Sequence, residues 1–207
     1  MVQKEVIDIR ILRSKKAISD TLMGLLNERD FKTITITEIV NKAGVNRGTF
    51  YKHYAYKEDI LQEIQDDFLE QLATMLESNY QDVCYSNLKT VLLSDVLFTF
   101  IYDHRNFFHL AIHTVGFLNF QMQFSAVIKD FLIKNFFSTA QHALKPPDPL
   151  AAYIANGIYG YLAEWDENDY ASSPTEAAQQ LTDIFILDRS IFCLPAVNLV
   201  PDEEFVD

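Results

Sequence analysis

Basic and hydroxyl side chains gather in the segment GVNRGTFYKHYAYKED, residues 44–59, which holds only two acidic residues. Arg47 can donate two hydrogen bonds to one guanine, and Thr49 and His53 can reach base edges or phosphates. The alternative interpretation is a short surface helix with a solvated, charged face. These residue types suit contact with the major groove of double-stranded DNA, and the charge distribution and helix signals described next favour this interpretation over the alternative.

Further candidates for DNA contact flank these three side chains. Side chains that can donate to phosphate oxygens are Thr35, Thr37, Tyr51, Lys52 and Lys57. The free amides at the start of the helix near Lys57 are expected to point toward the same phosphates. Gly48 carries no side chain, so the backbone there can approach the duplex closely.

The basic segment belongs to an acidic protein, because the 207 residues carry a formal net charge of −12. Residues 1–57 hold 11 lysines and arginines against 6 acidic residues, a net charge of +5. Residues 58–207 hold 6 basic against 23 acidic residues, a net charge of −17. This asymmetry favours a polyanionic partner for the N-terminal part.

Helix signals on both sides of a glycine turn position the DNA-contact candidates. Thr35, with Glu38 three residues later, forms a capping box that predicts a short helix directly after it. Gly44 ends this helix, and Asn46 caps a second one over Arg47–His53. Two short helices joined by a tight turn, with another helix before them, describe a helix-turn-helix.

The order of these residues is also familiar. The segment TITITEIVNKAGVNRGTFYKHYAYKEDIL, residues 33–61, resembles the DNA-binding domain of the TetR/AcrR family of bacterial transcriptional regulators. The Ala-Gly-Val turn, the Thr-Phe-Tyr-Lys-His-Tyr run and the following Lys-Glu-Asp carry the resemblance. It covers about residues 10–62, and EWDENDYASSPTEAAQQL, residues 164–181, is similar to the C-terminal region of many members.

The resemblance implies an all-α homodimer that binds a palindromic operator through its N-terminal helices. It also implies a C-terminal body with a small-molecule pocket and a dimer interface built from the last two helices. Two residues depart from the family pattern. Asp30 stands where members commonly have glycine, and Tyr56 stands where Ser, Asn or Asp would cap the next helix, which weakens that cap by ~1 kcal/mol.

Beyond the N-terminal segment the sequence predicts helices and no sheet. The helical periodicity resumes after Tyr56, a buried segment follows over residues 88–102, and further helices are expected over residues 119–144, 150–165 and 174–192. The prolines of KPPDP, residues 145–149, cannot continue a helix, so we expect a break between helices there. We therefore divide the chain into a helix-turn-helix domain (1–56), a helical regulatory and dimerisation domain (57–195) and a tail (196–207).

Many aromatic residues lie between positions 95 and 137, and most of them must be core. Candidates for contact with an effector are Asp95, Phe98, Tyr102, His109, His113, Phe117 and Phe120. An aromatic, acidic cavity favours a cationic or aromatic ligand. The two histidines lie four residues apart and can chelate a metal, but without a recognisable acidic partner we expect packing and no metal site. We expect no cofactor other than a small-molecule effector bound in the body.

The last two helices offer small and large residues for packing against a second copy of the chain. The candidate interface residues are Tyr153, Gly157, Tyr161, Leu181, Ile184, Phe185 and Asp188. The alternative is a core private to one subunit. A helix-turn-helix protein usually binds two half-sites about one helical turn (~34 Å) or a multiple of it apart, which favours the dimer.

The sequence therefore predicts a ligand-responsive DNA-binding repressor, with a protein-binding coregulator of the same fold as the alternative. No Ser-His-Asp order, glycine-rich phosphate loop or metal set suggests an enzyme. No apolar run reaches the roughly 18 residues of a membrane span. The charged N-terminus is unlike a secretory signal, so we expect a cytoplasmic protein without a membrane partner. Cys84 and Cys193 suit buried free thiols, with a disulfide as the alternative.

Overall fold

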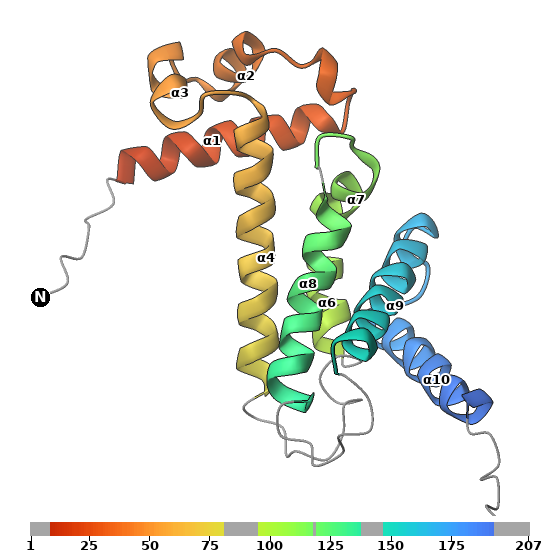
Figure 1. Ribbon diagram of the computed structural model, residues 1–207. Coiled ribbons are helices and arrows are strands. Elements are labelled where there is room, and N and C mark those ends of the chain that lie inside the picture. Colours follow the sequence, from red (N-terminus) through yellow and green to blue (C-terminus); the bar gives the residue numbers. More distant parts are fainter. Residues whose placement is uncertain (1–8, 81–94, 118, 138–146, 193–207) are drawn as a thin grey trace, which may run out of the picture.

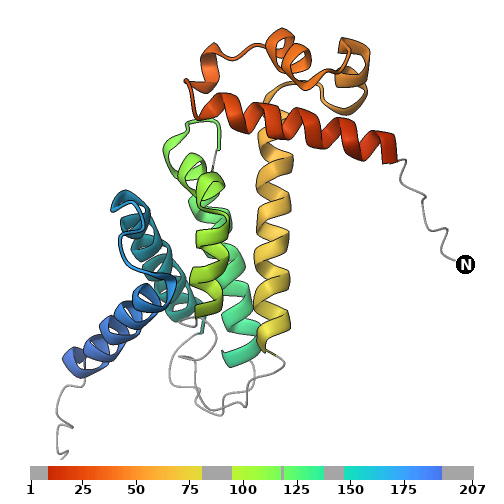
Figure 2. The same cartoon turned by 180° about the vertical axis from the view of Figure 1, so that it is seen from behind.

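The computed structural model describes residues 9–80, 95–117, 119–137 and 147–192, which form helices and turns without a strand. Figures 1 and 2 show the N-terminal helices lying across one end of a bundle that the later helices form. The helix α4, Glu58–Tyr80, begins beneath the N-terminal helices and runs along the bundle. The fold class is all-α, as the sequence predicts.

We call residues 9–57 the head. Its elements are α1 (Ile9–Leu26), the 3₁₀ turn η1 (Phe31–Thr33), α2 (Ile36–Ala43) and α3 (Arg47–His53). The helix α1 lies across the top of α4 and packs on α2 and on α4 (Figure 1). Ile18, Leu22 and Leu25 form its fully buried stripe, since they recur at helical spacing on one face.

Local capping determines where the two short helices of the head begin and end. Thr35 Oγ1 accepts a hydrogen bond from the amide of Glu38 at 3.3 Å, and α2 begins at the next residue. Gly44 ends α2 in the left-handed conformation, with φ of 68°. Asn46 Oδ1 accepts from the amide of Thr49 at 2.7 Å, and α3 follows. The predicted bounds of α3 are confirmed.

The structure shows the local roles of Asp30 and of the residues around Tyr56, the two departures from the family pattern. Asp30 has φ of −59° and ψ of 135°, and its carboxylate accepts from the amide of Lys32 at 2.8 Å. It therefore caps η1. Asp59 fixes the turn before α4, because its Oδ2 accepts from the amides of Ala55 and Tyr56 at 2.7 and 2.9 Å. The helix α4 then begins at Glu58.

The body consists of α4 and the helices that follow it: α6 (Asp95–Asp103), α7 (Arg105–His113), α8 (Phe120–Leu132), the π-helical turn η2 (Ile133–Phe137), α9 (Pro147–Glu167) and α10 (Pro174–Phe192). The helix α8 lies between α4 and α9, and α10 packs mainly on α6. The core of the body is strongly aromatic. Phe68 of α4 packs on Phe107 of α7 with ring centroids 4.5 Å apart, and Phe124 of α8 packs on Tyr159 of α9.

Proline marks helix starts in the body. The helix α9 begins at Pro147, inside the segment that we expected to be a break, because the first helical turn tolerates proline. The helix α10 begins at Pro174, as predicted. Ser173 caps it through a reciprocal pair: its hydroxyl accepts from the amide of Glu176 at 3.3 Å, and the Glu176 carboxylate accepts from the amide of Ser173 at 2.8 Å.

Some predictions lie outside the described residues. These are the states of Cys84 and Cys193, residues 88–94 of the expected buried segment, residues 138–144 of the expected helix over 119–144, and the tail at 196–207. The side chains of Phe185 and Asp188 also lie outside the described part, although the backbone of α10 there is helical. Among the helices that the structure describes, none combines the length and apolar character that a membrane crossing requires.

Lys57 joins the head to the start of α4. Its ammonium donates hydrogen bonds to the carbonyl oxygens of Phe31 and Ile34 at 2.7 and 2.8 Å. The same ammonium lies 4.3 Å from the centroid of the Phe31 ring, a cation–π contact. One charged group thus satisfies the carbonyls of the segment between α1 and α2.

Gly116, in the loop after α7, completes this junction from the body side. A β-carbon at position 116 would lie 2.4 Å from Leu61 Cδ1 and 3.1 Å from the Phe31 ring. Both neighbours are buried, so only glycine lets the loop come this close. The body therefore contacts the head directly at Phe31.

We predict that Lys57→Met lowers the free energy of unfolding by about 1–3 kcal/mol, because two carbonyls lose a charged donor while the aliphatic stem is kept. The matched control is Lys52→Met, at an exposed position of α3, where we expect no change beyond about 0.5 kcal/mol. Urea unfolding followed by circular dichroism measures both. Equal stability of the two variants would contradict the structural role of Lys57.

Candidate nucleic-acid interface and effector region

The helix α3 has one exposed and one buried face. Arg47, Gly48, Tyr51 and Lys52 are exposed, while Thr49 and His53 are partly buried. The opposite face carries Phe50 and Tyr54, the latter directly after the helix, and both are buried against the rest of the head. The structure therefore places Arg47, Tyr51 and Lys52 on the exposed face of α3, whereas Thr49 and His53 are partly covered.

Tyr54 links α3 to α1 and α4. Its hydroxyl lies 3.3 Å from Glu63 Oε1, and Glu63 Oε2 accepts from the Lys15 ammonium at 2.7 Å. Burial and the negative charge of Glu63 raise the pKa of Tyr54 well above its ordinary value, so its hydroxyl stays protonated and donates to the carboxylate. The orientation of α3 thus depends on residues of both longer helices.

The expected contacts on α2 lie beside α3. Thr37 is exposed, and its hydroxyl accepts a hydrogen bond from the Arg47 guanidinium. Thr35 is exposed at the start of α2, where its hydroxyl caps the helix. Lys57 differs, because its ammonium bonds backbone carbonyls of the head. We assign Lys57 a positioning role, since a phosphate contact would have to share or replace those bonds.

Among the described residues, the expected effector contacts lie in different surroundings. Phe98, Phe117 and Phe120 are buried in the aromatic core. Asp95 is exposed at the start of α6, where its carboxylate accepts from the Thr175 hydroxyl at 3.3 Å. Tyr102 is partly buried and packs edge-on against Tyr170, with ring centroids 5.8 Å apart.

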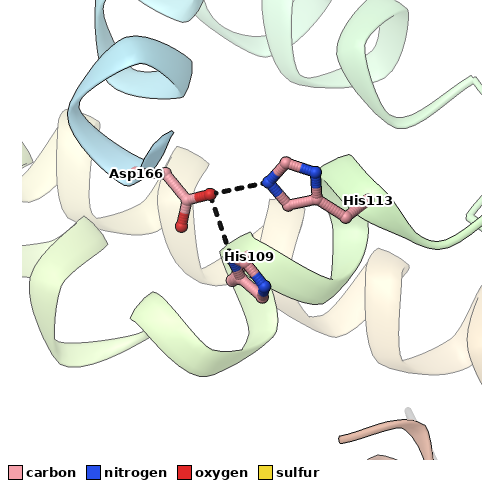
Figure 3. Close-up of side chains that lie close together, drawn as sticks. All are labelled: His109, His113 and Asp166. Atoms are coloured by element: carbon pink, nitrogen blue, oxygen red, sulfur yellow. Dashed lines mark hydrogen bonds and ion pairs between the residues drawn. The ribbon is translucent and has the colours of Figure 1, made fainter. Parts of the chain in front are cut away.

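His109 and His113 do share a pocket. It is an open hollow of about 720 Å³, lined by Arg105, Asn106, His109, His113, Asp166, Glu167, Asp169 and Tyr170. Figure 3 shows both imidazoles turned toward the carboxylate of Asp166, which comes from α9. His109 Nδ1 and His113 Nε2 each lie 3.0 Å from Asp166 Oδ2.

Asp166 is the acidic partner that the sequence did not reveal. It stands 57 and 53 residues from the two histidines, so no spacing rule connects them. Its second oxygen, Oδ1, accepts from the Tyr170 hydroxyl at 2.8 Å. Burial and the Asp166 carboxylate raise the pKa of Tyr170 well above its ordinary value, which keeps this hydroxyl a donor.

The expected dimer residues fall into two groups. Tyr153 and Gly157 on α9 and Ile184 on α10 are exposed. Leu181, by contrast, is only 2% exposed within a single chain, which places it in the private core. Tyr161 is partly buried, and its hydroxyl donates to Gln180 on α10 at 2.8 Å.

Comparison with known proteins relates both parts of the chain to one family. The family described as "Bacterial regulatory proteins, tetR family" matches residues 18–64, and the one described as "Transcriptional regulator C-terminal region" matches residues 93–186. The HTH-type transcriptional regulator YxbF of Bacillus subtilis (strain 168) is 27% identical over 172 residues. These residues are 81% of this chain and 43% of YxbF, so the chain spans less than half of that relative's length.

Solved structures share the fold along nearly the whole of their own chains. A putative TetR-family regulator from Syntrophomonas wolfei is 18% identical with a TM-score of 0.70, covering 88% of this chain and 97% of that one. FadR from Bacillus subtilis, in complex with stearoyl-CoA, is 15% identical with a TM-score of 0.64, covering 83% and 97%. NalD, a secondary repressor of a multidrug efflux pump in Pseudomonas aeruginosa, is 17% identical with a TM-score of 0.62, covering 85% and 95%.

The match to residues 18–64 agrees with the resemblance of residues 33–61 to the TetR/AcrR family. The match to residues 93–186 and the shared fold extend the similarity to the helical bundle. The chain belongs to the TetR family of bacterial transcriptional regulators.

Proposed function

We propose that this protein is a ligand-responsive transcriptional repressor that binds a palindromic operator as a homodimer. The observation that carries the proposal is the exposed surface of α3 with the neighbouring start of α2. Arg47, Tyr51 and Lys52 lie on that surface, while Phe50 anchors the opposite face. A short helix held this way can enter the major groove and present its side chains to bases and phosphates.

The body supplies the regulatory part of the proposal. A small molecule that binds the body more tightly in one conformation than in another shifts the population toward that conformation. Because α4 runs from the head into the bundle, a shift of α4 changes the position of the head. FadR, which has the same fold, was solved in complex with stearoyl-CoA, and this supports a small-molecule effector for this protein.

A coregulator that binds only other proteins is the second candidate. It would not need an exposed arginine, tyrosine and lysine on the helix that corresponds to the recognition helix. The exposure of these three side chains therefore favours DNA binding. The proposal assigns no catalytic role to the chain.

DNA binding can be tested with a fluorescent duplex that covers the region upstream of the protein's own gene, against a scrambled duplex, over a salt series. We expect preferential binding, with a log–log salt slope of about −0.9 for each phosphate contact. Lys52→Ala should weaken binding to both duplexes and reduce the steepness of the slope by about 1. Arg47→Ala should weaken the binding free energy for the preferred duplex by about 1–3 kcal/mol and reduce the preference for it over the scrambled duplex.

The matched control is Lys134→Ala, which removes one exposed positive charge from η2 in the body. It should leave affinity and slope unchanged. If Lys52→Ala and Lys134→Ala behave alike, α3 is not the DNA-binding element. The wild-type protein is also offered duplexes selected from a random pool. If it prefers none of the duplexes, the protein-binding coregulator becomes the better hypothesis.

Dimerisation is proposed through the exposed faces of α9 and α10. Ile184 is 50% exposed there, and a charged residue buried at a subunit interface is strongly destabilising. We predict that Ile184→Glu shifts the protein from dimer to monomer in sedimentation velocity at micromolar concentration. Val115→Glu, at an exposed apolar residue of the loop after α7, should leave the dimer intact. A monomeric wild type would contradict the homodimer.

A further inference from the structure

We propose that His109, His113 and Asp166 bind a divalent transition-metal ion of the zinc type. The two histidines lie four residues apart on α7, so they share one face of that helix. Asp166 reaches them from α9 with its side chain fully buried, whereas the histidine side chains are 56% and 42% exposed. One candidate ligand atom from each residue lies within 4.8 Å of the others.

The distances suit such an ion. A zinc ion lies about 2.0–2.2 Å from nitrogen and oxygen ligands, which places neighbouring ligand atoms of a tetrahedral site about 3.3 Å apart. The two nitrogen–oxygen distances here are both 3.0 Å. Without a metal, both nitrogens that face the carboxylate must carry protons, because an ionised carboxylate only accepts. One divalent ion can replace those two protons with a small outward movement of the rings.

The residues around the carboxylate resemble the outer shell of a metal site. Tyr170 donates to Asp166 Oδ1 at 2.8 Å, which leaves Oδ2 for the ion, and ligating carboxylates are commonly fixed by such bonds. Asp169 and Tyr170 both have left-handed backbones, with φ of 53° and 54°. Non-glycine residues adopt this conformation at an energetic cost, and here it turns the chain after α9 so that the Tyr170 hydroxyl meets Asp166.

The donor set indicates the class of metal. Two imidazoles and one carboxylate suit zinc, cobalt or nickel, whereas calcium and magnesium prefer sites built from oxygen ligands alone. Three protein ligands leave at least one coordination position open, and the hollow in front of the histidines gives that position access to solvent. Water or a small anion can therefore occupy it.

The site also lies near the junction with the head. His113 is the last residue of α7, and Gly116 three residues later packs against Phe31 of the head and Leu61 of α4. An ion held by α7 and α9 together would restrain the helix that reaches this junction. A change in DNA affinity on metal binding is therefore part of the proposal. This regulatory half rests on the proposed DNA-binding function, while the metal site itself does not.

The test uses the full-length, tag-free protein after removal of metals with a chelator. Titration with Co²⁺ followed by visible absorption, and titration with Zn²⁺ followed by calorimetry, measure stoichiometry and affinity. We expect one ion per chain with cobalt ligand-field bands, and no binding of Mg²⁺ or Ca²⁺ at the same concentrations. His109→Gln and His113→Gln should each lower the affinity at least about 10-fold, and Tyr170→Phe should lower it about 10-fold.

His104→Gln is the matched control, because His104 stands just before α7 and its Nδ1 lies 2.8 Å from the Phe100 carbonyl oxygen, away from the cluster. It should bind metal like the wild type. Far-UV circular dichroism checks that each variant is folded. The metal site is overturned if the folded wild type binds neither ion at millimolar concentration, or if the His109→Gln/His113→Gln double variant binds as well as the wild type.

The same preparations separate the two halves of the proposal. Duplex affinity is measured for the metal-free and the zinc-loaded protein, and we expect the two values to differ at least about 5-fold. Metal binding with equal duplex affinity overturns the regulatory half and leaves the site. Failure to bind any duplex in either state counts against the proposed function and not against the metal site, which the cobalt spectrum reports independently.

Discussion

The contact on which the rest of the structure depends is the one between the Lys57 ammonium and the carbonyl oxygens of Phe31 and Ile34. It joins the end of the head to the segment between α1 and α2, directly before α4 begins. The Phe31 ring contacts this ammonium and also lies close to Gly116 of the body. The head and the body therefore meet at Phe31.

The surface of α3 is a consequence of this arrangement. Seven residues are too few for a helix to be stable alone in water, so α3 depends on its caps and on burial. Phe50 is buried completely, and the Tyr54–Glu63–Lys15 chain of polar contacts ties the end of α3 to α4 and α1. The exposed side chains of α3 are thereby held in fixed positions relative to α4, as recognition of a DNA sequence requires.

Sequence analysis predicted those features that depend on neighbouring residues. The starts of α2 and α3, the glycine turn between them and the start of α10 all follow from caps within three or four positions. The same reasoning misplaced Pro147, because a proline that cannot continue a helix can still begin one. It did not reveal the bonds of Lys57 to backbone carbonyls, since these carbonyls lie 23 and 26 residues away, and the phosphate contact of Lys57 stays a prediction.

The site in the body shows the same limit more strongly. The spacing of His109 and His113 was visible, but Asp166 meets them only because α7 packs on α9. Phe98, Phe117 and Phe120 are buried in the core, and aromatic composition is common to cores and to effector sites, so their part in an effector site stays a prediction. Residue types indicated which side chains can do chemistry, and packing between distant helices decided which of them meet.

In the proposed homodimer, each copy of the chain presents its α3 surface to DNA. The two surfaces are then related by a two-fold axis, which requires an operator with two inverted half-sites. The most direct measurement of this claim is selection of duplexes from a random pool by the full-length protein, followed by sequencing of the bound fraction. The account predicts enrichment of one short half-site in two inverted copies at a fixed separation, and loss of that enrichment in Arg47→Ala. A bound fraction without an enriched sequence, or the same enrichment with Arg47→Ala, would contradict it.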